Sequence, residues 1–488
     1  MISDSTVAIF FLFYTYFLSL VPVFCGLEHI YFPMYIISFA LLFYRLLFDC
    51  SFFDNHGNGY LILFVAAFLI SVIFNGFSSI RNNIISGATI MVSFFLLYTG
   101  SSLRSKDNLL KLTKNIARFG MVITGLNSVV SLVLLISDTS ILFFNSVGRA
   151  FYIGVSNELR FTGLQGNPNI FGWVSLIGLG CSVIYLMFIK KKSKIKSAGA
   201  VLSIGLQVLC TGLSLSRGAF YGMIVGLFFM MAARLFMAFP KLKTSKIVSR
   251  IAASAILCAA LVFVGNFVFS STLRLINSTW EFLDIEPENS TITIDRSHQS
   301  GDAWSTGRNF LITAGFKTLS ENNAYAFGVS PGAAEERWVE QVDKSYSKID
   351  AQHYVVSEGA GNMHNLFLQT LFVMGILGLA ILLGFVFFIS KTLYRAFIKN
   401  KKEVKEKDVI AALIYVLFSI GTVAMVDNIL IYGSGMYNAF FMLCCGILVK
   451  LLISVLGPEV AFDKVDQTLR KPFMIADDKI RSMFKKSE

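Results

Sequence analysis

The chain has 488 residues, of which 55% are hydrophobic and only 15% charged, and its mean hydropathy is +0.67. This composition excludes a soluble globular protein, which could not bury so much apolar surface. The formal net charge of +12 does not indicate nucleic-acid binding, because the basic residues form runs between apolar segments. The seven cysteines lie in or near apolar stretches and predict neither a disulfide framework nor a metal site.

Apolar stretches of about 20 residues, the length that crosses a bilayer core, recur along the chain. They are continuous rather than alternating, so we expect helices, which satisfy their own backbone hydrogen bonds in lipid. The predicted fold class is an all-α polytopic membrane protein without a cleavable signal peptide. Twelve spans are expected near residues 7–24, 30–48, 60–77, 84–100, 119–137, 169–189, 198–215, 218–236, 251–270, 365–390, 409–426 and 437–456.

The basic runs predict the topology. The positive-inside rule places both termini and the following basic segments in the cytoplasm: 101–118, 190–196, 234–250, 391–407 and the tail after Pro458. The expected organisation is nine spans over 1–270, an outer loop over 271–364 that caps the site, three spans over 365–456, and a cytoplasmic tail over 457–488. The tail mixes charged and apolar residues, which is typical of an amphipathic helix on anionic lipid.

The outer loop has more acidic than basic residues and shows the signals of a partly helical cap. These signals are a helical pattern over 309–319, turn glycines at Gly328 and Gly332, an aromatic residue at Trp338 and a hinge at Gly359 and Gly361. We therefore expect a small folded unit above the membrane, just before the tenth span.

Two motifs lie near the ends of spans six to eight. Arg160 precedes Asn167-Pro168-Asn169, which has the sequence of an ordinary helix entry, with Asn167 as the cap. Arg217, in Ser216-Arg217-Gly218, lies between two membrane-length apolar segments. An arginine at that depth is costly unless it meets an anion, a headgroup or water. Snorkelling to lipid headgroups and binding of a phosphorylated lipid are both open at this point.

Two further motifs flank the outer loop. Arg308 opens its helical stretch, where a cation is unfavourable to the helix dipole, although a salt bridge would also explain it. His364 and Asn365 precede the tenth span, and such a histidine is by itself usually a polar cap. The predicted topology, however, puts the three arginines and this histidine on one membrane face. Arginine forks suit diphosphate oxygens, and histidine accepts a hydroxyl proton near neutral pH.

At these residues the chain resembles the O-antigen ligase / O-antigen polymerase family of bacterial membrane glycosyltransferases. The motifs that carry the resemblance are Arg160 and Gly163 with Asn167-Pro168-Asn169, Ser216-Arg217-Gly218, Gly307-Arg308 with Gly328 and Pro331-Gly332, and His364-Asn365 before Gly375 and Gly378. They span roughly 160 to 380. Each motif is short, but their order, with one large outer loop before His-Asn, is fairly specific.

The resemblance implies a metal-independent, inverting transferase of the GT-C type without a cofactor. It implies that Arg217 and Arg308 hold the donor diphosphate, with Arg160 as a weaker third, and that His364 activates the acceptor hydroxyl. Asn365 and Asn169 would support these groups. The family often has an acidic or polar residue shortly after His-Asn, whereas here Gln369 is the first polar group; Glu358 is the candidate carboxylate partner of His364.

The implied partners are a polyprenyl-diphosphate-linked glycan, membrane lipid, a chain-length regulator protein and an acceptor hydroxyl on a lipid-linked repeat or on lipid A-core. The implied location is the bacterial inner (plasma) membrane, with the site on the periplasmic or extracellular side.

A polysaccharide polymerase is favoured over a ligase only because polymerases occur in more kinds of cell envelope. A flippase would place charges along a midplane path, whereas here mid-span charges are nearly absent and Asp427 lies at a span end. A non-enzymatic scaffold would not need arginines on one rim.

Overall fold

A computed structural model describes residues 10, 14, 31–48, 55–98, 105–137, 139–144, 150–155, 161–189, 193–238, 245, 246, 248, 249, 252, 253, 255, 256, 259, 308–345, 361–399, 404–427, 430–432 and 436–485. In chain order the apolar helices are α2 (Tyr31–Phe48), α3 (Asn58–Phe74), α4 (Ile80–Met91) continued by the π-helix η4 (Val92–Tyr98), α5 (Lys106–Ile136), α6 (Pro168–Ile189), α7 (Lys194–Leu213), α8 (Arg217–Ala238), α13 (Leu366–Tyr394) continued by the π-helix η6 (Arg395–Lys399), α14 (Lys407–Ala424) and α15 (Met436–Leu456).

Helices occupy every predicted span except those near 7–24 and 251–270, which lie almost entirely outside the described residues. Within the described part, 8 helices are long and apolar enough to cross a membrane, and the chain is a multi-pass membrane protein. Helix α5 begins at Lys106, inside the segment predicted as a cytoplasmic loop. It does so because Ser105 caps it, accepting a hydrogen bond from the backbone N of Asn108 (3.3 Å).

The all-α prediction was wrong between α5 and α6, where a three-stranded antiparallel sheet lies. Its strands are β1 (Ser140–Phe144), β2 (Ala150–Val155) and β3 (Phe161–Gly163), in the order β1-β2-β3, and Ser140 pairs with Gly154. The run Ile141-Leu-Phe-Phe144 is too short to span a membrane and is rich in residues that favour strands.

Helices α8 and α14 pack antiparallel to one another through a glycine face. At one end Arg234 of α8 pairs with Asp408 of α14 (2.7 Å). Towards the other end, a Cβ built on Gly222 would lie 2.7 Å from the backbone oxygen of Ser419, and one on Gly218 would lie 2.9 Å from Val426. Small residues at every fourth position allow such close approach in membranes. The start of α8 is therefore fixed beside the end of α14.

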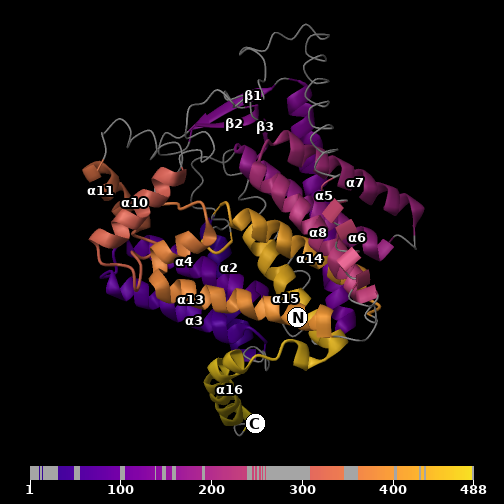
Figure 1. Ribbon diagram of the computed structural model, residues 1–488. Helices are drawn as coiled ribbons and strands as arrows, with labels where there is room; N and C mark the ends of the chain where they lie inside the picture. The colour runs from indigo at the N-terminus through magenta and orange to yellow at the C-terminus, as the bar shows by residue number, and fades with distance from the viewer. Residues whose placement is uncertain are drawn as a thin grey trace.

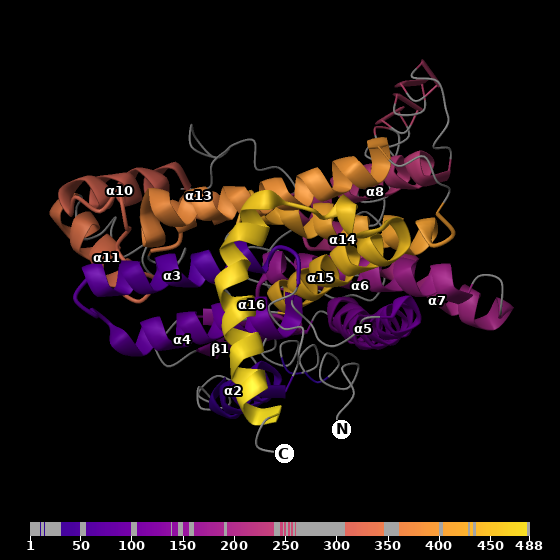
Figure 2. The same cartoon turned by 90° about the horizontal axis from the view of Figure 1, so that it is seen from below.

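The segment predicted as the outer loop contains two described helices, α10 (Arg308–Glu321) and α11 (Ala334–Ser345). We call residues 308–345 the cap. The helix predicted over 309–319 is confirmed, and Trp338 is fully buried, donating from Nε1 to the backbone oxygen of Leu311 (3.3 Å). Figures 1 and 2 show α10 and α11 together at one end of the molecule.

The cap docks into a break in α13. Gly375 has a left-handed φ of 68°, and the helical hydrogen-bond ladder is interrupted there. A turn segment of the cap fills the gap: Val329 N donates to Phe372 O (3.0 Å) and Ile376 N donates to Tyr325 O (2.8 Å). A side chain at Gly375 would overlap the cap backbone. Glycine is therefore required both for the positive φ and for the close approach of the cap.

The tail forms the amphipathic helix α16 (Lys464–Lys485), which follows the short 3₁₀ turn η7 (Pro458–Val460) and packs against the start of α3. Gly59 N donates to Asp466 Oδ1 (2.9 Å), and Tyr60 donates to Asp463 Oδ1 (3.2 Å). Lys391 of α13 pairs with Asp463 (2.7 Å). The beginning of α16 therefore ties α3 to α13.

Candidate functional site

His364 occupies an unusual backbone conformation immediately before α13. Its φ is 47°, in the left-handed region that few non-glycine residues adopt, although histidine adopts it more readily than most. Hydrogen bonds on either side hold it: His364 N donates to Asn362 Oδ1 (2.9 Å), and Asn365 caps α13 by accepting from the backbone N of Phe367 (2.9 Å). The backbone from which the imidazole projects is therefore held in place.

The carboxylate partner of His364 is Asp427. The His364 Nδ1 and Asp427 Oδ1 atoms lie 3.2 Å apart, and their side chains are only 11% and 9% exposed. An ionised carboxylate only accepts hydrogen bonds, so this contact assigns the proton to Nδ1 and makes Nε2 the basic nitrogen. The candidate named from the sequence, Glu358, lies outside the described residues.

The Ser216-Arg217-Gly218 motif lies beside this pair. Gly218 packs on Val426, the residue before Asp427, and the Asn365 side chain donates to the backbone oxygen of Met425 (2.7 Å). The starts of α8 and α13 and the end of α14 therefore meet, although 63 residues separate His364 from Asp427.

Arg217 is the first residue of α8, and its side chain is exposed. Within the described part of the chain, no hydrogen bond or ion pair engages its guanidinium. Ser216 precedes it as the cap and accepts from the backbone N of Ala219 (3.4 Å). A charged fork next to a helix N-terminus is an arrangement that attracts anions.

The start of α6 joins the same region. Asn167 caps α6 as predicted, accepting from the backbone N of Asn169 (2.8 Å). A Cβ built on Gly172 would lie 2.6 Å from Ser214 Oγ and 3.1 Å from Ser216 Cβ. Asn169 thus lies in the first turn of a helix that packs against the Arg217 turn, and the N-termini of α6, α8 and α13 together contribute positive potential here.

The position of Arg308 is known through its helix. Arg308 is the first residue of α10, and its side chain lies outside what the structure describes. Seven residues later, Gly315 packs against Met363, the neighbour of His364. Arg160 lies outside the described residues. The structure thus brings together His364, Asn365, Arg217 and the first turn of α6, which contains Asn169, and it places the helix of Arg308 against Met363, the neighbour of His364.

This arrangement can hold an anion and move a proton at one place. A histidine whose Nδ1 is held by a carboxylate suits general-base catalysis through Nε2, and the arginine suits a phosphate group. Asp427 could have been suspected from the sequence, because it is a single acidic residue between two apolar spans, where a charge is costly.

No curated protein matches the chain. A family model described as O-Antigen ligase matches residues 202–383, which contain Arg217, Arg308 and His364 but not Asp427. Together with the multi-pass helical fold, this match supports assigning the chain to the O-antigen ligase/polymerase family.

Proposed function

We propose that the protein is a polysaccharide polymerase, which transfers a glycan from a polyprenyl diphosphate to a sugar hydroxyl on a second lipid-linked repeat. The observation that carries the proposal is the buried His364–Asp427 pair beside the exposed Arg217. The family match supports glycan transfer of the O-antigen ligase or polymerase type.

In the proposed reaction, His364 Nε2 takes the proton of the acceptor hydroxyl while Asp427 stabilises the imidazolium that forms. The hydroxyl oxygen attacks the anomeric carbon of the donor as the bond from that carbon to the diphosphate oxygen breaks. Arg217 and Arg308, with Arg160 as a third cation, hold the charge that develops on the leaving diphosphate. Attack opposite the leaving group inverts the anomeric centre. Arginines supply the charge neutralisation, so the proposal includes no metal or cofactor.

The proposed location is the bacterial inner or plasma membrane, with the site on the outer side. The charge distribution supports this orientation, because the helix ends opposite His364 carry Arg234 and Lys391, and basic residues favour the cytoplasm. The donor diphosphate would then lie at the outer lipid surface, with the acceptor glycan in the aqueous phase. A chain-length regulator is a proposed further partner.

A ligase that transfers the chain to lipid A-core or to a protein is the second candidate, favoured by the description of the matching family. Gene deletion followed by a glycan gel separates the candidates. Single-repeat products after deletion indicate a polymerase, and accumulated long lipid-linked chains indicate a ligase. Loss of all outer-face glycan together with cytoplasmic accumulation of the donor would indicate a flippase instead.

Complementation then tests the site. We expect a His364→Ala variant to restore protein level but not transfer, because the acceptor hydroxyl would lack its base. Glycan of normal amount and length in that variant would refute the catalytic role.

A further inference from the structure

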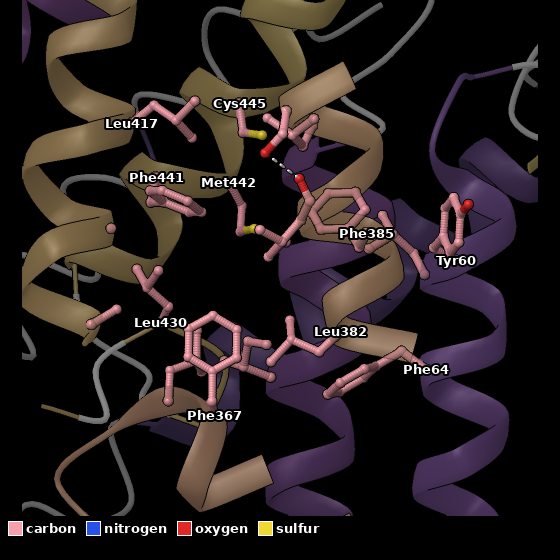
Figure 3. Close-up of a pocket in the computed structure, with 18 of the residues that line it drawn as sticks. Tyr60, Phe64, Phe367, Leu382, Phe385, Leu417, Leu430, Phe441, Met442 and Cys445 are labelled. Carbon is pink, nitrogen blue, oxygen red and sulfur yellow. Dashed lines mark hydrogen bonds between the residues drawn. The ribbon is translucent and has the colours of Figure 1, made fainter. Parts of the chain in front are cut away.

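A long apolar pocket begins directly beneath the candidate site. It is lined by α3, α13, α14 and α15 and has a volume of about 320 Å³, at the lower end of the range for small-ligand sites. Figure 3 shows Phe367 and Leu430 at one end of the pocket and Tyr60 and Cys445 near the other. The pocket begins at Leu366, two residues after His364.

The pocket is much longer than a compact ligand site needs to be. Along α13 its lining runs from Ile381 to Leu393, a distance of about 18 Å at 1.5 Å per residue. Together with Leu366 and Phe367 before the break, this lining extends from the candidate site into the depth of the apolar helices. A narrow cavity of this length fits a hydrocarbon chain better than it fits a sugar or a headgroup.

Each hydroxyl among the described lining residues of the pocket already donates its hydrogen within the protein. The three hydroxyls in its lining are already hydrogen-bonded within the protein: Tyr60 to Asp463, Ser390 to the backbone oxygen of Val386 and Thr422 to that of Phe418. The remaining lining is apolar apart from the Cys445 thiol. An apolar occupant is therefore the one that the pocket suits.

The pocket also has an opening towards the surroundings of the helices. Val386 on α13 and Met425, which follows the last residue of α14, both line it, and they are 39% and 51% exposed. In Figure 3, Leu417 and Phe441 approach from one side and Leu382 and Phe385 from the other, with the pocket between them. A chain can enter sideways from lipid through the gap between α13 and α14.

We infer that this pocket binds the polyprenyl chain of the donor, an assignment that rests on the proposed function. In a donor, the isoprenoid begins one diphosphate away from the reacting anomeric carbon. In an acceptor, at least one sugar separates the reacting hydroxyl from any diphosphate and lipid. A hydrocarbon pocket that begins beside His364 and Met425 therefore has the spacing that the donor requires and not that of the acceptor.

The pocket contributes positioning more than affinity. The chain is surrounded by hydrocarbon both in the bilayer and in the pocket, so transfer between them gains little from the hydrophobic effect. The gain comes from close contacts and from a fixed direction of approach. With its first isoprene units in the pocket, the donor presents its diphosphate beside Arg217 and its anomeric carbon beside His364.

Gly421 offers a way to fill the pocket without disturbing the fold. It lies on α14 in the pocket lining, and a Cβ built there would meet no atom within 4 Å. We expect Gly421→Phe to project into the pocket and to lower kcat/KM for the lipid-linked donor about tenfold, the effect of about ten lost carbon–carbon contacts. Gly205→Phe is the matched control, because Gly205 lies on α7, outside the pocket, with the same open space around it.

Photolabelling tests the occupant without requiring turnover. The full-length protein in phosphatidylethanolamine and phosphatidylglycerol vesicles is irradiated with a polyprenyl diphosphate that carries a diazirine in its chain. We expect labelled peptides from α13 and α15, with labelling lost in Gly421→Phe and retained in Gly205→Phe. A diazirine-bearing phosphatidylglycerol is the comparison, and we expect it to label the lipid-facing helices instead.

Three results would overturn the inference: labelling of α7 in preference to α13 and α15, equal labelling of the pocket peptides by the phospholipid, or unchanged labelling in Gly421→Phe. Any of them, with transfer still dependent on His364, would refute the pocket assignment and leave the proposed function standing. Normal glycan after gene deletion would refute the function itself, and the glycan gel detects this without a photolabelling probe.

Discussion

Asp427→Asn is the sharpest test of the site, because it keeps the shape of the side chain and removes only its charge. Asp427 touches His364 through one contact of 3.2 Å and is 9% exposed. The amide either donates to Nδ1, which would move the imidazole proton to Nε2, or accepts from it without stabilising the imidazolium. In both cases Nε2 becomes a poorer base for the acceptor hydroxyl.

The size of the loss follows from the contact. A hydrogen bond to a charged group contributes about 1.5–3 kcal/mol, and each 1.36 kcal/mol of barrier changes the rate tenfold. We therefore expect kcat to fall roughly ten- to 150-fold. The KM for the donor should change little, because the diphosphate is assigned to arginines and not to this pair.

A double-mutant cycle decides whether Asp427 acts through His364. Transfer rates are measured in vesicles for Asp427→Asn, His364→Ala and the double variant. If the carboxylate works only by holding the imidazole, the double variant should be no slower than His364→Ala, because groups that act as a unit are strongly non-additive. Asp408→Asn is the matched control: Asp408 lies at the other end of α14, paired with Arg234.

Two results would refute this reasoning. One is an Asp427→Asn variant that retains more than half of the wild-type kcat. The other is a double variant whose losses multiply, which would show that the carboxylate acts independently of the histidine. A fall in expression that Asp408→Asn reproduces would instead report on helix packing.

Three further predictions concern other parts of the molecule. Arg217→Lys should slow transfer, because an ammonium lacks the planar fork that fits two phosphate oxygens; an unchanged rate in vesicles would show that Arg217 only snorkels to headgroups. Gly222→Ala should destabilise the protein by about 1–3 kcal/mol through overpacking, because its Cβ would lie 2.7 Å from an α14 backbone oxygen. The measurement is the midpoint of thermal unfolding, and Gly205→Ala, whose Cβ would lie in open space, should leave that midpoint unchanged. Burial alone would raise the pKa of Asp463, but hydrogen bonds, including one from Lys391, outweigh it and lower that pKa below 3.8. The contribution of the Lys391–Asp463 pair to docking of α16 is therefore present above pH 3.8 and lost as the pH falls below it. Proteolytic release of α16 should accordingly rise on acidification, and also at neutral pH in Lys391→Met, and equal resistance under all conditions would contradict the anchoring role.

Most of the spans and the helix starts that carry the candidate residues could be predicted from the sequence because both depend on local signals. Length and hydropathy located most of the described helices within a few residues, as for α6 and α15 but not for the start of α5, and Asn167 carried its own cap signal. The order of the arginine and histidine motifs, together with the positive-inside rule, placed the candidate residues on one face. These signals extend over a few turns of helix and need no tertiary information.

Two of the features that were missed depend on partners far away in the chain. Hydropathy is continuous across Gly375, so nothing local predicts the break, which exists because residues 325–330 supply the missing hydrogen bonds. Asp427 resembled an ordinary span end, and only the packing of α8 on α14 brings it to His364. The small sheet was missed because its strands lie in a region that shows no span.

The hydrogen bonds between the cap and α13 limit how a lipid-linked donor could enter and leave the site. Lifting the cap would expose the backbone groups of the broken helix, which its hydrogen bonds now satisfy, and leaving such groups unpaired in an apolar setting is costly. The cap and α13 should therefore move together, and the cap should not open like a lid. Donor exchange is then expected to proceed by lateral diffusion within the plane of the bilayer, so that its rate depends on membrane fluidity more than on cap movement.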